Sequence, residues 1–209
     1  ADDLQAEQHA IEIVENYMDE DIDLILAVGS GTVHDISRYV AFQYKIPFIS
    51  VPTAASAEGF VSTEAEMVWN GQKKLIAAEA PIAVYADTDI FANAPTELNL
   101  SGAIRVNSSD TYLTERKISE TQIKEGDPDT CEKLMYALVL SGLARQMTGN
   151  SRPASGAEHH LVHLWDMEVL NGHLDALHGE KVSAGTMVAL IEYKKIADAI
   201  RRKTCKVHT

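Results

Sequence analysis

Residues 24–32 read Leu-Ile-Leu-Ala-Val-Gly-Ser-Gly-Thr, a short apolar run that ends in a glycine-rich turn. A continuous run of this length is typical of a strand buried on both faces of a parallel sheet. Apolar residues at helical spacing follow from Ile36 to Tyr44, and a second apolar run occupies residues 47–52. Strand, glycine turn, helix and strand make a βαβ unit, which predicts an α/β part with a Rossmann-like parallel sheet.

The secondary structure expected from the sequence differs between the two halves of the chain. A helical rhythm covers residues 4–18, and a third strand is expected at residues 82–87, after a hairpin-like excursion around Asn70 and Gly71. After about residue 88 no segment reads as a strand, and helices are expected at residues 130–149, 157–170 and 182–200.

We therefore expect two domains with a boundary near residue 95. Residues 1–95 would form an α/β dinucleotide-binding domain, and residues 96–209 would form an all-α domain.

The composition narrows the classes of partner. The 209 residues carry 31 acidic and 18 basic side chains, a formal net charge of −13. This charge argues against nucleic acid and against an anionic membrane, since both require a basic surface. No apolar run reaches membrane-spanning length. The two cysteines, Cys131 and Cys205, are expected to be reduced, which indicates a cytoplasmic protein.

A histidine-rich segment is the first indication of a functional site in the sequence. Residues 151–163 read Ser-Arg-Pro-Ala-Ser-Gly-Ala-Glu-His-His-Leu-Val-His, and His178 follows. His159 and His163 are four residues apart, so on a helix they share one face. Two imidazoles on a helix, joined by a third from a nearby segment, can form part of a divalent metal site. The alternative is a polar helix face without a ligand.

The glycine turn at residues 29–32 is the second indication of a functional site. Gly29 and Gly31 allow close approach of the backbone, and the following helix offers free N–H groups that could hold a phosphate. The turn is not a full dinucleotide-binding fingerprint, because His34 stands at the sixth position, where the fingerprint has a glycine. It does not match the P-loop pattern either. An ordinary strand-to-helix turn is the alternative. The small-residue loop at residues 53–62 follows the second strand, where open α/β sheets bind ligands.

Three blocks together resemble one family. They are Gly-Ser-Gly-Thr-Val-His-Asp at residues 29–35, Pro-Phe-Ile-Ser-Val-Pro-Thr-Ala-Ala-Ser-Ala-Glu-Gly-Phe-Val-Ser at residues 47–62, and Ser-Arg-Pro-Ala-Ser-Gly-Ala-Glu-His-His at residues 151–160 with His-Gly-Glu-Lys-Val at residues 178–182. In content and order they are similar to the glycerol-1-phosphate dehydrogenases, which belong with the iron-type alcohol dehydrogenases and the dehydroquinate synthases. The resemblance implies a dehydroquinate synthase-like fold and the central portion of a longer protein.

The resemblance also implies a role for individual residues. It implies metal ligands at His159 and His178, and substrate contacts at Glu58 and His163. The position of Glu58 is an Asp in the family pattern. The resemblance implies cofactor contacts at Gly29, Ser30, Gly31, Thr32, Val33, Asp35, Thr53, Ser56 and Ser62.

The implied activity is a metal-dependent oxidoreductase. It would interconvert dihydroxyacetone phosphate, a small phosphorylated three-carbon substrate, and sn-glycerol 1-phosphate with NAD or NADP, in phospholipid biosynthesis. Zinc is the expected metal, and nickel and iron are compatible with the same ligands. A homodimer is implied. Two alternatives remain: a non-catalytic homologue that retains nucleotide binding, and a dehydroquinate synthase-like lyase.

One position departs from the family pattern. The expected third metal ligand is an Asp, and counting from Ala94-Pro95 places Arg105 there. Asp110 is the nearest carboxylate downstream, but it is out of register. A guanidinium about 4 Å from a divalent cation is repelled by roughly 8 kcal/mol at an effective dielectric near 20. We therefore expect either that Arg105 turns away from a weakly held metal or that the site binds none.

Overall fold

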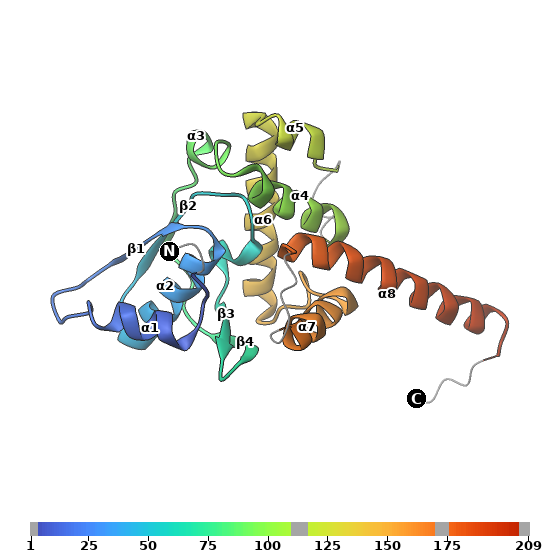
Figure 1. The fold of residues 1–209 in the computed structure, drawn as a ribbon, viewed down its shortest axis with the longest axis horizontal. Coiled ribbons are helices and arrows are strands. Elements are labelled where there is room, and N and C mark those ends of the chain that lie inside the picture. Colours follow the sequence, from blue (N-terminus) through green and yellow to red (C-terminus); the bar gives the residue numbers. More distant parts are fainter. Residues whose placement is uncertain (1–3, 110–116, 170–175, 205–209) are drawn as a thin grey trace.

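The computed structural model describes residues 4–109, 117–169 and 176–204 (Figure 1). Asp110 and Cys205, considered above, lie outside these ranges. The described elements are, in chain order, α1 (Gln8–Glu15), β1 (Ile25–Gly29), α2 (Gly31–Tyr44), β2 (Phe48–Pro52), the 3-10 helix η1 (Glu58–Val61), β3 (Glu64–Trp69), β4 (Gln72–Ala77), β5 (Ala83–Val84), α3 (Thr88–Phe91), α4 (Thr96–Ser109), α5 (Glu120–Lys124), α6 (Pro128–Thr148), α7 (Ala157–Val169) and α8 (His178–Arg201).

The strands β1, β2 and β5 form a parallel sheet with β2 in the middle. Parallel neighbours need a crossover, and α2 provides it between β1 and β2 by packing Ala41 against Ala27 and Phe48. This arrangement confirms the predicted βαβ unit. The third strand is shorter than the expected 82–87, because only Ala83 and Val84 pair with β2 before the chain turns into α3.

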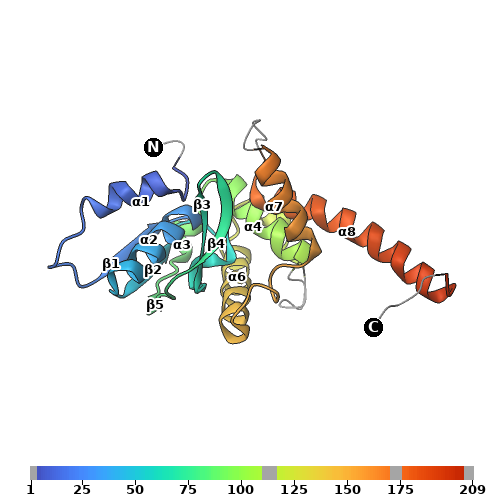
Figure 2. The same cartoon turned by 90° about the horizontal axis from the view of Figure 1, so that it is seen from below.

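The strands β3 and β4 form a separate antiparallel hairpin. Asn70 and Gly71 make its two-residue turn with φ angles of 53° and 71°, which suits the right-handed twist of the strands. The expected hairpin is therefore confirmed. Met67 packs on α2 through Ile36 and Val40, so the hairpin lies against the sheet unit, and Figure 2 shows it facing α4 and α7 on its other side.

Helices make up the second half of the chain. Among the described residues no strand follows Val84. The helix α6 stands between the sheet unit and the pair α7 and α8 (Figure 1). Its N-cap Asp127 accepts from the Thr130 N–H, and Gly149 ends it in the left-handed conformation. Leu134 and Leu138 of α6 pack with Phe60 and other residues from η1, α3, α4 and α5 into the main core.

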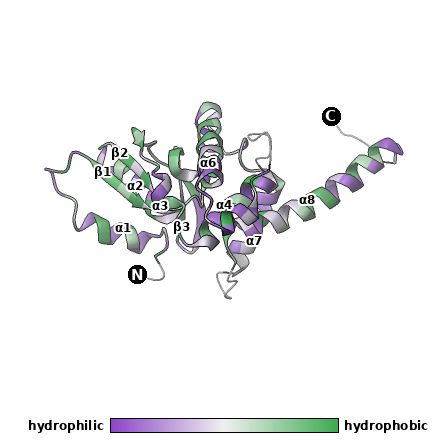
Figure 3. Ribbon diagram, turned by 90° about the horizontal axis from the view of Figure 1, so that it is seen from above, coloured by the Kyte–Doolittle hydropathy of each residue, from purple (hydrophilic) through white to green (hydrophobic). Residues whose placement is uncertain are grey.

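The helix α8 begins beside α4 and α7 and then projects away from the body of the molecule (Figure 1). Its projecting part carries both hydrophobic and hydrophilic residues (Figure 3), and the side chains of Leu190, Ile191 and Ile196 are exposed. In the described part of the chain, no helix has the length and apolar character that crossing a membrane requires.

Candidate metal centre and nucleotide-binding turn

The glycine turn joins β1 to α2 as the sequence predicts. A Cβ on Gly29 would lie 2.7 Å from Val33 Cγ2, so only glycine fits there. Ser30 is the N-cap residue of α2, and its side chain makes no capping hydrogen bond. Gly31, Thr32 and Val33 form the first turn of the helix and are partly exposed. The predicted cofactor residues 29–33 thus surround the start of α2, where the N–H groups are free to bind an anion.

His34 stands where the dinucleotide fingerprint has its third glycine, and its contacts give it a structural role. It is buried, its Nδ1 donates to the Ser30 carbonyl at 2.9 Å, and its Nε2 accepts from the Ser50 hydroxyl at 2.8 Å. Burial lowers the pKa of His34 to about 4, so the ring is neutral at pH 7. The residue therefore joins the glycine turn to β2.

The loop at residues 53–57 lies beside the glycine turn. The Thr53 N–H donates to the Gly29 carbonyl at 3.0 Å. The buried Asn99 of α4 accepts from the Ala55 N–H and donates to the Phe91 carbonyl, both at 2.7 Å. A Cβ on Gly102 would lie 2.0 Å from the Ala55 carbonyl oxygen, so α4 and the loop touch backbone to backbone. The loop that carries the predicted residues Thr53 and Ser56 is therefore held against α4.

The turn η1, which carries Glu58, is held by the buried Arg38 of α2. Its guanidinium donates to the carbonyls of Gly59, of Ser62 at 2.8 Å and of Glu64 at 3.2 Å. The hydroxyl of the predicted cofactor residue Ser62 is buried and accepts from the Glu64 N–H at 3.0 Å. The predicted residue Asp35 is partly exposed and lies 3.7 Å from Arg38. Sequence reasoning missed Arg38, because its partners are backbone carbonyls.

The structure brings three of the predicted site residues together. One ligand atom from each of Glu58, His159 and His178 lies within 4.8 Å of the others. His159 comes from the first turn of α7, and His178 is the first residue of α8. The two imidazole rings have centroids 5.4 Å apart. Segments distant in the sequence thus meet at one cluster of imidazoles and a carboxylate.

The neighbour of His159 fixes the orientation of its ring. Nδ1 of His159 lies 3.0 Å from Glu158 Oε1, which also accepts from the Gly156 N–H at 2.7 Å. The hydrogen bond from His159 lowers the pKa of Glu158 to about 2, so Glu158 is ionised and Nδ1 is the donor. In the neutral ring the lone pair is then on Nε2, which is buried and has no hydrogen-bond partner among the described residues. Metal-bound histidines are commonly oriented in this way.

Glu58 is a buried carboxylate between two arginines. Its Oε2 lies 2.9 Å from Arg105 Nε, and its Oε1 lies 3.5 Å from Arg145 Nη1. Burial raises the pKa of Glu58, but Arg105, followed by His178 and Arg145, outweighs this and holds the pKa well below its usual range. Arg145 also pairs with Glu64 at 2.9 Å. Glu58 is therefore ionised at neutral pH.

Arg105 lies where the family pattern carries its Asp ligand, and its side chain is fully buried. Besides Glu58, it donates from Nη2 to the Ala154 carbonyl at 3.1 Å. The repulsion expected between Arg105 and a metal ion did not take this carboxylate into account, and Glu58 places a negative charge 2.9 Å from the guanidinium.

His178 is attached to α4 through its neighbour Gly179. The Gly179 N–H donates to Ser101 Oγ at 3.0 Å, and a Cβ on Gly179 would lie 1.9 Å from the Ser101 carbonyl oxygen. Burial lowers the pKa of His178 to about 4, although Glu66 and Glu58 oppose it. His178 is therefore neutral at pH 7, the state in which an imidazole binds a metal.

The hairpin supplies further charged residues that sequence reasoning missed. Lys73 pairs with Glu66 at 2.7 Å and with Asp166 of α7 at 2.8 Å, and Asp166 also pairs with Lys181 of α8 at 2.8 Å. The predicted substrate residue His163 is half-buried, with Nδ1 4.0 Å from Glu66 Oε1. No motif marks these residues, because they lie on four separate elements, β3, β4, α7 and α8.

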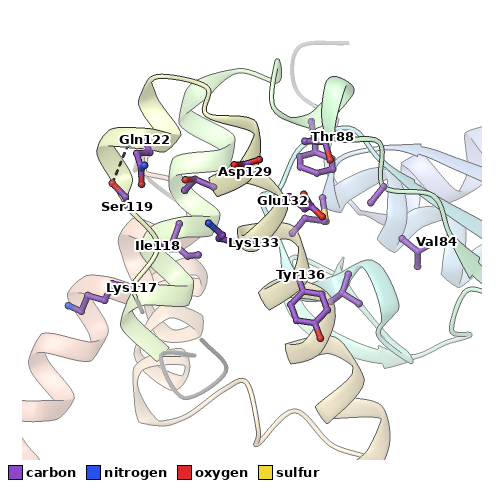
Figure 4. A pocket seen from close by; sticks show the side chains of 15 residues that line it. Val84, Thr88, Lys117, Ile118, Ser119, Gln122, Asp129, Glu132, Lys133 and Tyr136 are labelled. Carbon is purple, nitrogen blue, oxygen red and sulfur yellow. Dashed lines mark hydrogen bonds between the residues drawn. The ribbon is translucent and has the colours of Figure 1, made fainter. Parts of the chain in front are cut away.

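A cavity of about 1240 Å³ lies elsewhere in the molecule, next to α3, α5 and α6 (Figure 4). Thr88, Gln122 and Tyr136 are among its lining residues. None of the predicted site residues is among the described residues that line it. This cavity is therefore separate from the histidine cluster.

A divalent metal ion fits the histidine cluster. Two imidazoles and a carboxylate are ligands that zinc, nickel and iron accept. No described residue is a hydrogen-bond partner of the buried Nε2 of His159, and a metal ion would supply one. In a tetrahedral zinc site two ligand atoms are about 3.4 Å apart, and the ligand atoms of the cluster lie within 4.8 Å of one another.

Comparison with known proteins identifies the class. Residues 2–95 match the family described as iron-containing alcohol dehydrogenase. Glycerol dehydrogenase from Schizosaccharomyces pombe has a similar structure, with a TM-score of 0.67 at 20% identity over 91% of this chain and 56% of that chain. An iron-containing alcohol dehydrogenase from Thermotoga maritima gives 0.66 at 18% identity over 86% and 57%. The predicted dehydroquinate synthase-like fold class is confirmed, and residues 2–95 of the chain are similar to the iron-containing alcohol dehydrogenases.

Curated sequence relatives of the chain share one name. A glycerol-1-phosphate dehydrogenase (NAD(P)+) from Geobacillus thermodenitrificans is 36% identical over 222 residues, covering 93% of this chain and 55% of that protein. The protein of the same name from Pyrococcus horikoshii is 32% identical over 219 residues, covering 90% and 62%. The resemblance to the glycerol-1-phosphate dehydrogenases is confirmed, and the chain spans 55% to 62% of the length of these relatives.

Proposed function

We propose that the chain is part of a metal-dependent oxidoreductase that interconverts dihydroxyacetone phosphate and sn-glycerol 1-phosphate with NAD or NADP. The observation that supports this most is the cluster of Glu58, His159 and His178, in which the buried Nε2 of His159 has no partner in residues 4–109, 117–169 and 176–204. The names of the relatives support the choice of substrate.

In this proposal His159 and His178 hold the metal, with zinc expected and nickel or iron compatible. When bound, the metal acts as a Lewis acid that polarises the substrate carbonyl or stabilises the alkoxide. Glu158 keeps the proton of His159 on Nδ1, so that Nε2 is free to coordinate. His163 lies one turn further along α7, half-buried, where it would contact the substrate.

The cofactor would bind at the glycine turn. The free N–H groups at the start of α2, around Gly31, suit the pyrophosphate of a dinucleotide. Thr53 lies on the adjoining loop, which Asn99 and Gly102 fix against α4. The division at residue 95 into a dinucleotide-binding part and a metal and substrate part belongs to the same proposal, as does a homodimer.

The test is the oxidation of NADH or NADPH by the purified protein with dihydroxyacetone phosphate, with and without added zinc or nickel. We expect His159→Ala to abolish turnover and His160→Ala, at the exposed neighbouring position, to leave it nearly unchanged. Absence of turnover with every metal and both cofactors would refute the proposal.

A second function is a non-catalytic homologue that binds nucleotide but no metal. The ion pair of Arg105 with Glu58 favours it, because a cation already occupies the neighbourhood of the histidines. Nucleotide binding without metal binding or turnover would support this alternative. A dehydroquinate synthase-like lyase is less favoured, because the relatives are named as dehydrogenases.

A further inference from the structure

The position of Arg105 raises the question of which side chain completes the metal site. In the family pattern an Asp of this helix is the third ligand, and an arginine has no lone pair to replace it. The guanidinium of Arg105 is directed to Glu58 at 2.9 Å and to the Ala154 carbonyl at 3.1 Å. The helix α4 therefore brings a cation to the cluster and contributes no ligand from this position.

Among the described residues, the carboxylate that groups with both histidines belongs to Glu58. Its ligand oxygen lies within 4.8 Å of the ligand nitrogens of His159 and His178. Glu58 is one methylene longer than the Asp of the family pattern, so its carboxylate extends further from η1. The turn itself is fixed, because Arg38 holds its carbonyls and a Cβ on Gly142 would lie 2.7 Å from the Glu58 carbonyl oxygen.

The two oxygens of Glu58 have different surroundings. Oε2 forms the short contact with Arg105 Nε, whereas Oε1 is 3.5 Å from Arg145, beyond the range of a good charged hydrogen bond. Arg145 has a closer partner in Glu64, at 2.9 Å. Oε1 is therefore available to a cation, while Oε2 stays on Arg105.

His159 gives independent support for a ligand at this point. The residue is 4% exposed, and within the part of the chain that the structure describes its buried Nε2 has no hydrogen-bond partner. A buried polar atom without a partner is costly, so a native site usually supplies one. Because Glu158 fixes the ring through Nδ1, the lone pair of Nε2 can only be satisfied by an added donor or a metal ion.

On the basis of the function proposed above, we propose that Glu58 is the third protein ligand of the metal, in place of the missing Asp. Its carboxylate bridges the metal ion and Arg105, one oxygen to each. The negative charge thus lies between the two cations and reduces the repulsion between them. The site is a relocated version of the family centre, with its carboxylate supplied by η1 in place of α4.

The experiment measures zinc binding by competition with a chromophoric chelator, and cobalt(II) binding by its visible absorption, on the purified protein. Glu58→Gln should weaken zinc binding at least 100-fold and shift the cobalt spectrum, since a charged ligand is lost. Glu64→Gln is the matched control, because Glu64 also pairs with Arg145 but lies outside the cluster. It should change zinc binding by less than about threefold.

Other variants separate this proposal from the function on which it rests. If Glu58→Gln binds zinc as wild type does while His159→Ala and His178→Ala lose it, the role of Glu58 is refuted and the metal-dependent function stands. If wild type binds no metal and Arg105→Asp gains binding, the bridging carboxylate is refuted. If Glu58→Gln does not fold, Glu58→Asp serves instead, and an unchanged affinity and cobalt spectrum would overturn the proposal.

Discussion

The contact between Gly179 and Ser101 allows a sharp test of how the helices position the cluster. Gly179 directly follows His178, and a Cβ added to it would lie 1.9 Å from the Ser101 carbonyl oxygen. Real contacts of this kind are not closer than 3.0 Å, so Gly179→Ala must push α8 away from α4 by about 1 Å. The same movement stretches the hydrogen bond from the Gly179 N–H to Ser101 Oγ.

Gly179→Ala has one stabilising and two destabilising effects on the folded protein. Alanine is favoured over glycine inside a helix by about 1 kcal/mol. Overlap of two packed backbones costs about 3 kcal/mol, and the lost hydrogen bond costs about 1 kcal/mol. We therefore expect Gly179→Ala to lower the free energy of unfolding by about 3 kcal/mol, which in a chain of this size lowers Tm by about 6–12 °C.

Urea and thermal unfolding measure this change, with Ser101→Ala as the control that removes only the hydroxyl and costs about 1 kcal/mol. Zinc binding gives a second readout, because a shift of His178 by about 1 Å spoils the convergence of the ligands. If Gly179→Ala is as stable as wild type or more so, helix propensity alone governs this position and the described packing of α8 on α4 is wrong.

Three further predictions concern buried polar groups. Burial lowers the pKa of His34 to about 4, so the neutral ring contributes about 3 kcal/mol to the free energy of unfolding above pH 6.5, and this contribution is lost as the pH falls toward 4. His34→Gln should therefore flatten this part of the plot of stability against pH, measured by urea titration. An unchanged slope would contradict this prediction. Asn99→Ala strands two buried backbone groups and should cost about 2–4 kcal/mol in thermal unfolding, whereas a loss under 1 kcal/mol would show that water replaces the amide. Asp166→Asn weakens the contacts to Lys73 and Lys181 and should cost about 1–3 kcal/mol at low salt, with a smaller loss at 1 M salt; equal losses at both salts would exclude a mainly electrostatic role.

Local signals predicted much of the fold. The apolar run at residues 24–28 and its glycine turn identify a buried parallel strand, and Asn70-Gly71 identifies a hairpin, because these features depend on backbone conformation near each residue. The length of the third strand was overestimated. Strand ends depend on pairing with β2, and the ladder comprises Ala83 and Val84, with hydrogen bonds to β2 from the N–H groups of Ile82 and Tyr85 on either side. Periodicity in the sequence does not report such pairing.

The candidate site was less accessible from sequence. Spacing and resemblance indicated His159 and His178, but no local pattern predicts that the carboxylate of Glu58 meets them from about a hundred residues away. Arg38 was missed because an arginine bonded to carbonyls has no sequence signature. Arg105 was recognised as a departure, yet the charge argument lacked its partner, and the pairing with Glu58 changes what the residue does.

The contacts of Arg38 also bear on the order in which the chain folds. They join residues only 21 to 26 positions apart, whereas Lys73 and Asp166 are 93 positions apart. Closing a short loop costs less entropy than closing a long one, so local contacts tend to form first. The βαβ unit can thus set the η1 turn before the later helices dock. The cluster of Glu58, His159 and His178 is then among the last parts of the molecule to form, and an incompletely folded chain would not present its three side chains together.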